Sequence, residues 1–195
     1  LLELREVSTS IAGYEILHEV SLAVSSGERM AIMGPAGSGK STLLKVMAGL
    51  TPADRGLALF DGRNIGALSD KDELEFRRRA SFAFQDGALW ENQSVLDNLT
   101  LSLRIHRSWM SPGETVERAR ATLARLGYTD SAAVRPAELS LGERKLVSIA
   151  RALVLDPELI FLDDPTGHLD EDARERVFDI VDELAEAGRC IVAVT

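Results

Sequence analysis

The stretch GPAGSGKST, residues 34–42, stands between an apolar run and a helical pattern, and it decides the fold of this chain. Its first eight residues fit G-x-x-x-x-G-K-[ST], whose glycines let backbone N–H groups turn inward around phosphate oxygens. The helix that follows adds the partial positive charge of its N-terminus. A glycine turn without a ligand is the alternative, which the Lys-Ser pair and the flanking segments disfavour. The stretch therefore predicts a phosphate-binding loop.

The positions of this loop have distinct expected roles at a nucleotide. Lys40 reaches the β- and γ-phosphates, and the Ser41 hydroxyl is a ligand for Mg²⁺. The whole cradle is expected to comprise Gly34, Pro35, Ala36, Gly37, Ser38, Gly39, Lys40, Ser41 and Thr42.

A second motif supplies the carboxylates that such a metal site needs. The run LIFLDDP, residues 159–165, reads as an apolar strand that delivers Asp163 at its C-terminal edge, where the ligands of parallel sheets gather. Asp163 is expected to hold Mg²⁺ through water, and Asp164 to point at the attacking water. Together the two motifs predict a nucleoside triphosphatase.

Composition narrows the class of protein. The chain has 195 residues, 45% of them apolar, and a net charge of −9, which argues against non-specific binding to nucleic acid. No apolar stretch approaches the roughly 20 residues that span a bilayer, and no signal pattern opens the chain, so we expect a cytoplasmic location. Cys190, in an apolar run, is expected to be a small buried hydrophobe.

Short apolar runs alternate with helical patterns, the order of an α/β fold with a mostly parallel sheet. Strands are expected at 28–33, 80–84, 158–163 and 190–195, and helices at 41–50, 116–127, 142–155 and 171–188. The first 27 residues and segment 56–62 predict an N-terminal antiparallel β subdomain. We expect one domain over 1–195, with a core at 1–86 and 151–195 and an inserted helical subdomain at 87–150. Both ends suggest a fragment, incomplete at the C-terminus.

The order and spacing of Lys40, Gln85, Ser140, Asp163 and Asp170 resemble the nucleotide-binding domain of ATP-binding cassette (ABC) transporters over almost all of the chain. The resemblance implies a P-loop ATPase that uses ATP and Mg²⁺. It also implies that Gln85 contacts the metal and a transmembrane permease, and that Ser140 and Gly142 cap the ATP of a second ATPase subunit. Such a protein would be peripheral on the inner face of the cell membrane.

A finer resemblance lies in FAFQDGALWENQSVLDNL, residues 82–99, which is similar to the ATPase subunits of Mla/Mce-type lipid transporters. It implies lipid cargo and makes Leu89 and Trp90 candidate partner contacts. Packing of Trp90 inside the helical subdomain remains an equal alternative. Another importer or extractor ATPase, such as a lipoprotein-releasing or amino-acid system, is the second possibility within the family.

The chain departs from the family pattern at two places. Asp164 stands where the family has Glu, and its side chain is shorter by about 1.5 Å, which predicts weaker proton abstraction. The family's signature L-S-G-G-Q corresponds here to Leu139-Ser140-Leu141-Gly142-Glu143, so a leucine replaces the first glycine and a glutamate replaces the glutamine. Leu141 lacks the freedom of glycine, and Glu143 adds a negative charge near an anionic ligand. These changes predict weaker binding of ATP across the dimer, unless the helix that follows the loop compensates for them.

Three hypotheses therefore remain. The first is an ATPase that couples ATP-driven dimer closure to a permease. The second is a degenerate subunit that binds ATP but hydrolyses it slowly, beside a competent partner in a heterodimer. The third, a soluble ABC protein of translation or DNA repair, is disfavoured because the chain is acidic and carries no tandem cassette.

Four further residues have weaker assignments. Tyr14 is a candidate to stack on adenine, ahead of the P-loop. The family's switch histidine is expected one residue beyond Thr195, and His168 better fits the dimer-facing loop before Asp170. His18 and His106 are expected to be surface or packing residues, because no metal-ligand companions lie at useful spacing.

Overall fold

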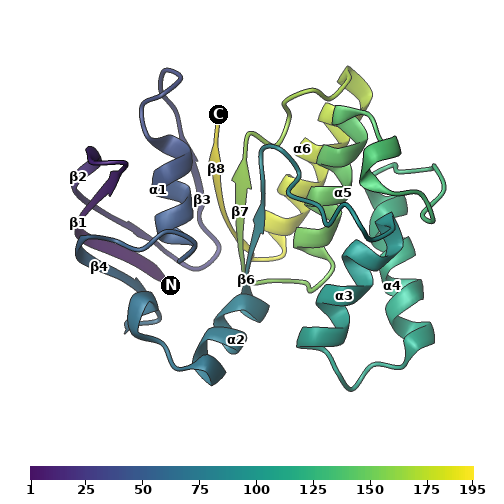
Figure 1. Ribbon diagram of the computed structural model, residues 1–195, viewed down its shortest axis with the longest axis horizontal. Coiled ribbons are helices and arrows are strands. Elements are labelled where there is room, and N and C mark those ends of the chain that lie inside the picture. Colours follow the sequence, from purple (N-terminus) through teal and green to yellow (C-terminus); the bar gives the residue numbers. More distant parts are fainter.

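A four-stranded parallel sheet forms the centre of the molecule (Figure 1). The computed structural model describes residues 1–195, and the sheet has the order β3-β8-β7-β6. Its strands are β3 (Arg29–Ile32), β6 (Ala80–Ala83), β7 (Leu159–Asp163) and β8 (Cys190–Val194). All residues of β7 are buried, as its continuous apolar run predicts for a strand covered on both faces. The four expected parallel strands are thus confirmed to within two residues.

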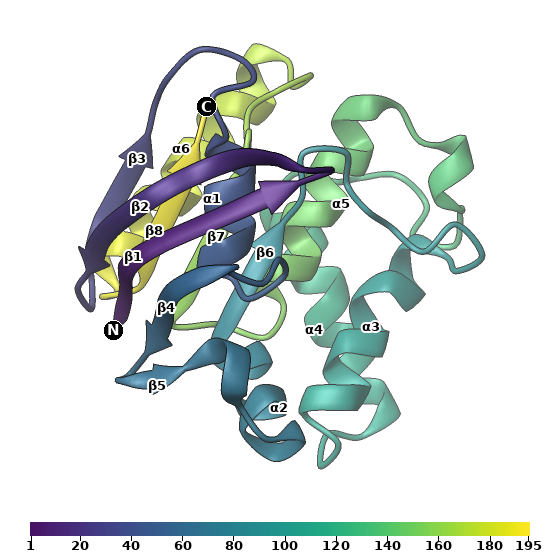
Figure 2. The same cartoon turned by 60° about the vertical axis from the view of Figure 1, so that its left-hand side comes forward.

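A second sheet of four antiparallel strands lies at the N-terminal side of the molecule and has the order β2-β1-β4-β5. Its strands are β1 (Leu2–Ile11), β2 (Tyr14–Val24), β4 (Arg55–Phe60) and β5 (Arg63–Asn64). Helix α1 (Lys40–Met47) lies between the two sheets and contacts β2, β7 and β8 (Figure 2). Buried Leu44 and Met47 of α1 belong to the apolar core shared by both sheets. This arrangement confirms the predicted α/β class with its antiparallel subdomain.

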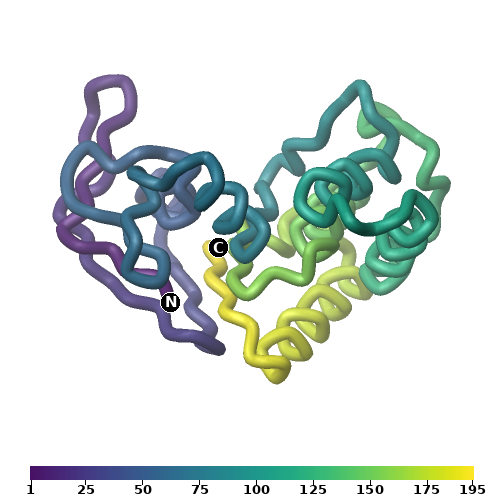
Figure 3. The backbone as a smooth tube through the Cα atoms, turned by 90° about the horizontal axis from the view of Figure 1, so that it is seen from below, coloured from purple at the N-terminus to yellow at the C-terminus, as the bar shows by residue number.

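Helices cover the opposite face of the parallel sheet and form the other half of the molecule (Figure 3). They are α3 (Val95–His106), α4 (Pro112–Arg125), α5 (Leu141–Leu153) and α6 (Glu171–Glu186). α5 contacts β6 and β7, while α6 contacts β8. The expected limit of the helical subdomain at residue 150 falls inside α5, so the domain boundaries stay a prediction.

Three short helices complete the chain: α2 (Asp70–Arg79) and the 3₁₀ turns Ile65–Ala67 and Pro136–Glu138. The sequence reading did not identify α2, because Phe76 is its only buried residue and no apolar periodicity marks it. Its polar signals are present, since Ser69 caps the helix by accepting the Asp72 N–H. No helix of the chain combines the length and apolar character needed to cross a bilayer.

Candidate functional site

The phosphate-binding loop connects β3 to the first turn of α1. Gly37 and Gly39 have φ angles of +78° and +88°, in the left-handed region that glycine adopts without steric cost. A Cβ atom on Gly39 would also lie only 3.0 Å from Ile16 Cγ2 of β2. Strand β2 therefore packs closely against the loop and leaves little room for a side chain at residue 39. No side chain caps the N-terminus of α1, which leaves its first N–H groups for an anion.

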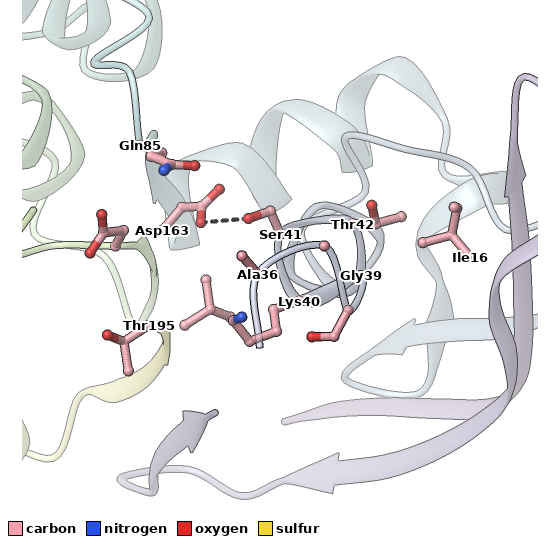
Figure 4. A pocket seen from close by; sticks show the side chains of 13 residues that line it. Ile16, Ala36, Gly39, Lys40, Ser41, Thr42, Gln85, Asp163 and Thr195 are labelled. Carbon is pink, nitrogen blue, oxygen red and sulfur yellow. Dashed lines mark hydrogen bonds between the residues drawn. The ribbon is translucent and has the colours of Figure 1, made fainter. Parts of the chain in front are cut away.

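The two predicted metal ligands meet at the C-terminal edge of the parallel sheet (Figure 4). Ser41 Oγ, in the first turn of α1, donates a hydrogen bond of 2.8 Å to Asp163 Oδ1 at the end of β7. Asp163 is only 3% exposed, and Gln85 lies beside it, just after β6. A hydroxyl, a carboxylate and an amide oxygen are hard oxygen donors, the type that Mg²⁺ prefers. The residues present therefore fit a magnesium ion bound with a nucleotide phosphate.

These groups line a cleft of about 460 Å³. The lining is Ile16, Ala36, Gly37, Ser38, Gly39, Lys40, Ser41, Thr42, Gln85, Asp163, Asp164, Val194 and Thr195. Five segments far apart in sequence thus line the cleft, and three of them are the ones that the motifs predict: residues 36–42, Gln85 and residues 163–164. Gly34 and Pro35 form the start of the loop but do not line the cleft.

Lys40 lies along its own loop. Its Nζ donates hydrogen bonds of 2.6 Å to the Gly34 carbonyl and 2.9 Å to the Pro35 carbonyl. Both acceptors belong to the P-loop, and Lys40 lines the cleft.

The aromatic residue expected at the adenine does not line the cleft. Tyr14 is 76% exposed and lies two residues nearer the β1–β2 turn than Ile16, which does line it. Figure 4 places Ile16 at the opposite end of the cleft from Gln85 and Asp163. A nucleobase contact by Tyr14 stays a prediction, and Ile16 is the apolar side chain that the sequence reading missed.

The backbone conformation of residue 164 gives a physical reason why an Asp stands there in place of the family's Glu. Its φ of +47° is left-handed, which among residues other than glycine suits Asp and Asn best. The Asp164 N–H donates to the Val194 carbonyl at 2.9 Å, which ties this conformation to β8. A Cβ atom on Gly167 would lie 2.2 Å from Asp164 Oδ2, so the carboxylate packs against that glycine. A short carboxylate is therefore well suited to this backbone.

The signature segment begins α5, and Ser140 is its N-cap. The Ser140 Oγ accepts the Glu143 N–H at 3.2 Å, and a Glu143 carboxylate oxygen accepts the Ser140 N–H at 2.7 Å. This reciprocal capping box explains a Glu at this position. Hydrogen bonds from the side chains of Asp130 and Ser140 lower the pKa of Glu143, which keeps it ionised. The Glu143 carboxylate is thus bound by the N-cap of its own helix and by Asp130.

Neither Ser140 nor Gly142 lines the cleft of its own chain. Ser140 is exposed, and Leu141 is 62% exposed. A Cβ atom on Gly142 would lie 2.9 Å from the His168 carbonyl, so this glycine permits close packing between α5 and the loop before Asp170. The role of Ser140 and Gly142 toward the nucleotide of a second subunit stays a prediction.

A second groove, of about 370 Å³, is lined by residues of α2, β6, α3 and α5. Trp90 lines it, 42% exposed, with the Arg151 guanidinium 5.2 Å from the centre of its ring. Leu89 is partly buried against the helical core instead. Of the two candidate partner contacts, Trp90 is therefore placed on an accessible surface and Leu89 packs inward.

The other singled-out residues are not in the cleft. Cys190 is buried in β8, and burial raises the pKa of its thiol to about 11, so it is a small core residue as expected. His18 is exposed beside Glu15. His106 lines the second groove, and burial lowers its pKa. No three or more His, Cys, Asp or Glu side chains gather as a metal-binding group, so the magnesium site described above depends on Ser41 and Gln85 beside its carboxylate.

Comparison with known proteins agrees with this geometry. The family described as ABC transporter matches residues 17–167. The chain is 39% identical over 183 residues to the lipoprotein-releasing system ATP-binding protein LolD of Shewanella denitrificans, covering 93% of this chain and 78% of that protein.

Solved structures show the same fold. A dimeric ATP-binding cassette, MJ0796, in a post-hydrolysis state with ADP and Pi, superposes with a TM-score of 0.92 at 32% identity. The match covers 100% of this chain and 88% of that one. The ATP-binding subunit of another ABC transporter superposes with a TM-score of 0.85 at 26% identity, covering 100% and 79%.

Proposed function

This chain belongs to the ABC transporter family, and we propose that it is an ATP-binding and ATP-hydrolysing subunit that drives a membrane permease. The observation that carries the proposal is the meeting of Ser41 and Asp163, 2.8 Å apart, beside an uncapped helix N-terminus. That arrangement serves a metal-bound triphosphate and little else. The dimeric state of MJ0796 supports a second ATPase subunit as partner.

The residues divide the work of hydrolysis. The N–H groups of residues 36–42 and the Lys40 ammonium bind the phosphates and neutralise charge on them. Ser41, Asp163 and Gln85 would hold Mg²⁺, which when bound supplies further positive charge to the phosphate oxygens. Asp164, on the same cleft, accepts a proton from the attacking water. Ser140 and Gly142 act on the nucleotide of the partner subunit.

A competing proposal, a degenerate subunit that binds ATP and hydrolyses it slowly, rests on Asp164 and on the signature sequence alone. The left-handed backbone at Asp164 and the capping role of Glu143 offer structural reasons for both departures. These reasons favour a working site, so we propose hydrolysis as the normal activity.

The permease contact is proposed at the groove that Trp90 lines. The resemblance to LolD favours a lipid-modified protein or a lipid as cargo, with this subunit on the inner face of the membrane. Co-purification from detergent-solubilised membranes tests the contact. The native chain should retain a membrane subunit and Trp90→Ala should lose it, whereas a native chain that never co-purifies with one rules out the transporter role.

Phosphate release with Mg-ATP tests the activity. The native protein should exceed the Lys40→Ala variant clearly, and Asp164→Glu should add little. A silent native protein that Asp164→Glu activates would instead support the degenerate subunit.

A further inference from the structure

Lys145, in the second turn of α5, is a buried lysine that the mechanism above leaves unused. Its side chain is among the largest fully buried ones, and the residue is 2% exposed. The Nζ donates to the carbonyl oxygens of Gln85 at 2.5 Å, Phe84 at 3.2 Å and Asp163 at 3.3 Å. An ammonium has three N–H donors, so every one of them has a partner.

The three acceptors belong to the ends of two neighbouring strands. Phe84 and Gln85 directly follow β6, and Asp163 is the last residue of β7. These strands pair in parallel, with Ala83 opposite Leu162. Lys145 therefore joins, from below the cleft, the backbone that carries Gln85 to the backbone that carries Asp163 and Asp164.

Two further side chains of α5 hold the same segment after β6. Ser148 Oγ accepts the Phe84 N–H at 3.3 Å. Arg151 donates to the carbonyls of Ala88 at 2.8 Å and Gly87 at 3.2 Å. Lys145, Ser148 and Arg151 are spaced by three residues and so share one face of the helix. Of these three, only Lys145 also reaches β7.

Burial of this ammonium is costly, and the surroundings show what offsets the cost. Burial lowers the pKa of Lys145, while the nearby carboxylates of Asp164, Asp163 and Asp86 favour its charged form. The hydrogen-bonded carbonyls replace the lost water. A Leu or Met would fill the same space without that cost, so a lysine here indicates a role in placing the backbone that it binds.

We propose that Lys145 is a positioning residue that holds Gln85 and the Asp163–Asp164 strand end in one register. Because α5 starts at the signature segment, this link couples two of the metal ligands, Gln85 and Asp163, and the adjacent Asp164 to the signature helix. The predicted effect on kcat rests on the proposed ATPase function. The predicted effect on amide exchange rests on the contacts of Lys145 alone.

The test compares Lys145→Met, which removes the donors at similar volume, with Ser148→Ala, a matched loss of one hydrogen bond to the same segment. Amide hydrogen exchange is measured by mass spectrometry in both. Lys145→Met should speed exchange at residues 84–86 and at residues 163–164 together, whereas Ser148→Ala should speed it at residues 84–86 only.

Kinetics provide the second readout. In Lys145→Met, kcat for ATP should fall at least tenfold with KM changed less than twofold, because the P-loop is untouched. Ser148→Ala should lose less than threefold in kcat, and Lys145→Arg, which keeps N–H donors for these carbonyl oxygens, should recover most of the activity. If Lys145→Met does not fold, Lys145→Gln replaces it, since a Gln amide is too short to reach both strands.

Unchanged amide exchange at residues 163–164 in the folded Lys145→Met variant overturns the inference. So does a loss of kcat that merely follows the loss of stability in Lys145→Met and Ser148→Ala alike. A native protein without ATPase activity contradicts the proposed function instead, and the exchange comparison then still decides whether Lys145 links the two strand ends.

Discussion

Replacement of Gly167 by alanine should slow hydrolysis without loosening the fold. Gly167 lies on the loop that follows Asp164, and its own φ is not in the left-handed region, so its backbone tolerates alanine. A Cβ atom there would lie 2.2 Å from Asp164 Oδ2, although real Cβ atoms essentially never come under 3.0 Å. The crowded atom is the end of a side chain, which can move at little cost.

The size of that movement sets the expected loss of rate. The carboxylate oxygen must retreat by about 1 Å to reach ordinary contact distance. A misplacement of about 1 Å can cost on the order of 10²-fold in rate, which equals about 2.7 kcal/mol in the activation free energy. The free energy of unfolding should change by about 1 kcal/mol or less. ATP affinity should not change, because no residue of the P-loop is displaced.

Steady-state ATPase kinetics, a nucleotide-binding titration and urea unfolding measure the three quantities. Gly113→Ala is the matched control, since a Cβ atom there meets nothing within 4 Å. A Gly167→Ala protein that is folded, binds ATP normally and keeps full kcat would refute the assignment of the Asp164 carboxylate as the base.

Three other predictions follow from single contacts. Lys40→Ala should weaken ATP binding roughly 10- to 100-fold, the value of one hydrogen bond to a charged group, with unfolding unchanged; unaltered affinity in a titration contradicts its role. Asn98 is fully buried, accepts the Trp90 N–H at 2.9 Å and donates to the Ser94 carbonyl at 3.0 Å, so Asn98→Ala should lower the free energy of unfolding by about 2 kcal/mol or more in urea. The raised pKa of Cys190, about 11, keeps the buried thiol protonated at pH 8, so a thiol reagent should modify it only after denaturation; rapid labelling of native protein would contradict its burial.

Local patterns in the sequence were sufficient to predict the P-loop and the strand that ends at Asp163. A loop of the type at Gly34 to Thr42 binds phosphate through its own backbone, so the order of these nine residues alone predicts the cradle. The strand before Asp163 is uniformly apolar, and the parallel order of the sheet follows from the alternation of strands and helices. Helix α2 was not predicted, because its residues are mostly polar and only Phe76 is buried in the core.

Contacts between segments that are distant in the chain could not be predicted from the sequence. Its motifs predict that Ser41 and Asp163 share a metal, but they do not predict Ile16 at the cleft, since that depends on how β2 lies against the P-loop. From the sequence, Glu143 is expected to place a negative charge near a ligand. In the structure its carboxylate accepts a hydrogen bond from the N-cap residue Ser140.

The sequence by itself determined the α/β order, and it predicted a phosphate cradle and a magnesium carboxylate, because each of these two motifs is encoded within a few consecutive residues. Only the tertiary structure decided what supports that chemistry. The left-handed backbone at Asp164 depends on its hydrogen bond to β8, and Lys145 depends on carbonyls that two strands bring to one helix. Such contacts join residues far apart in the chain, and no local pattern of residue types records which backbone atoms will meet.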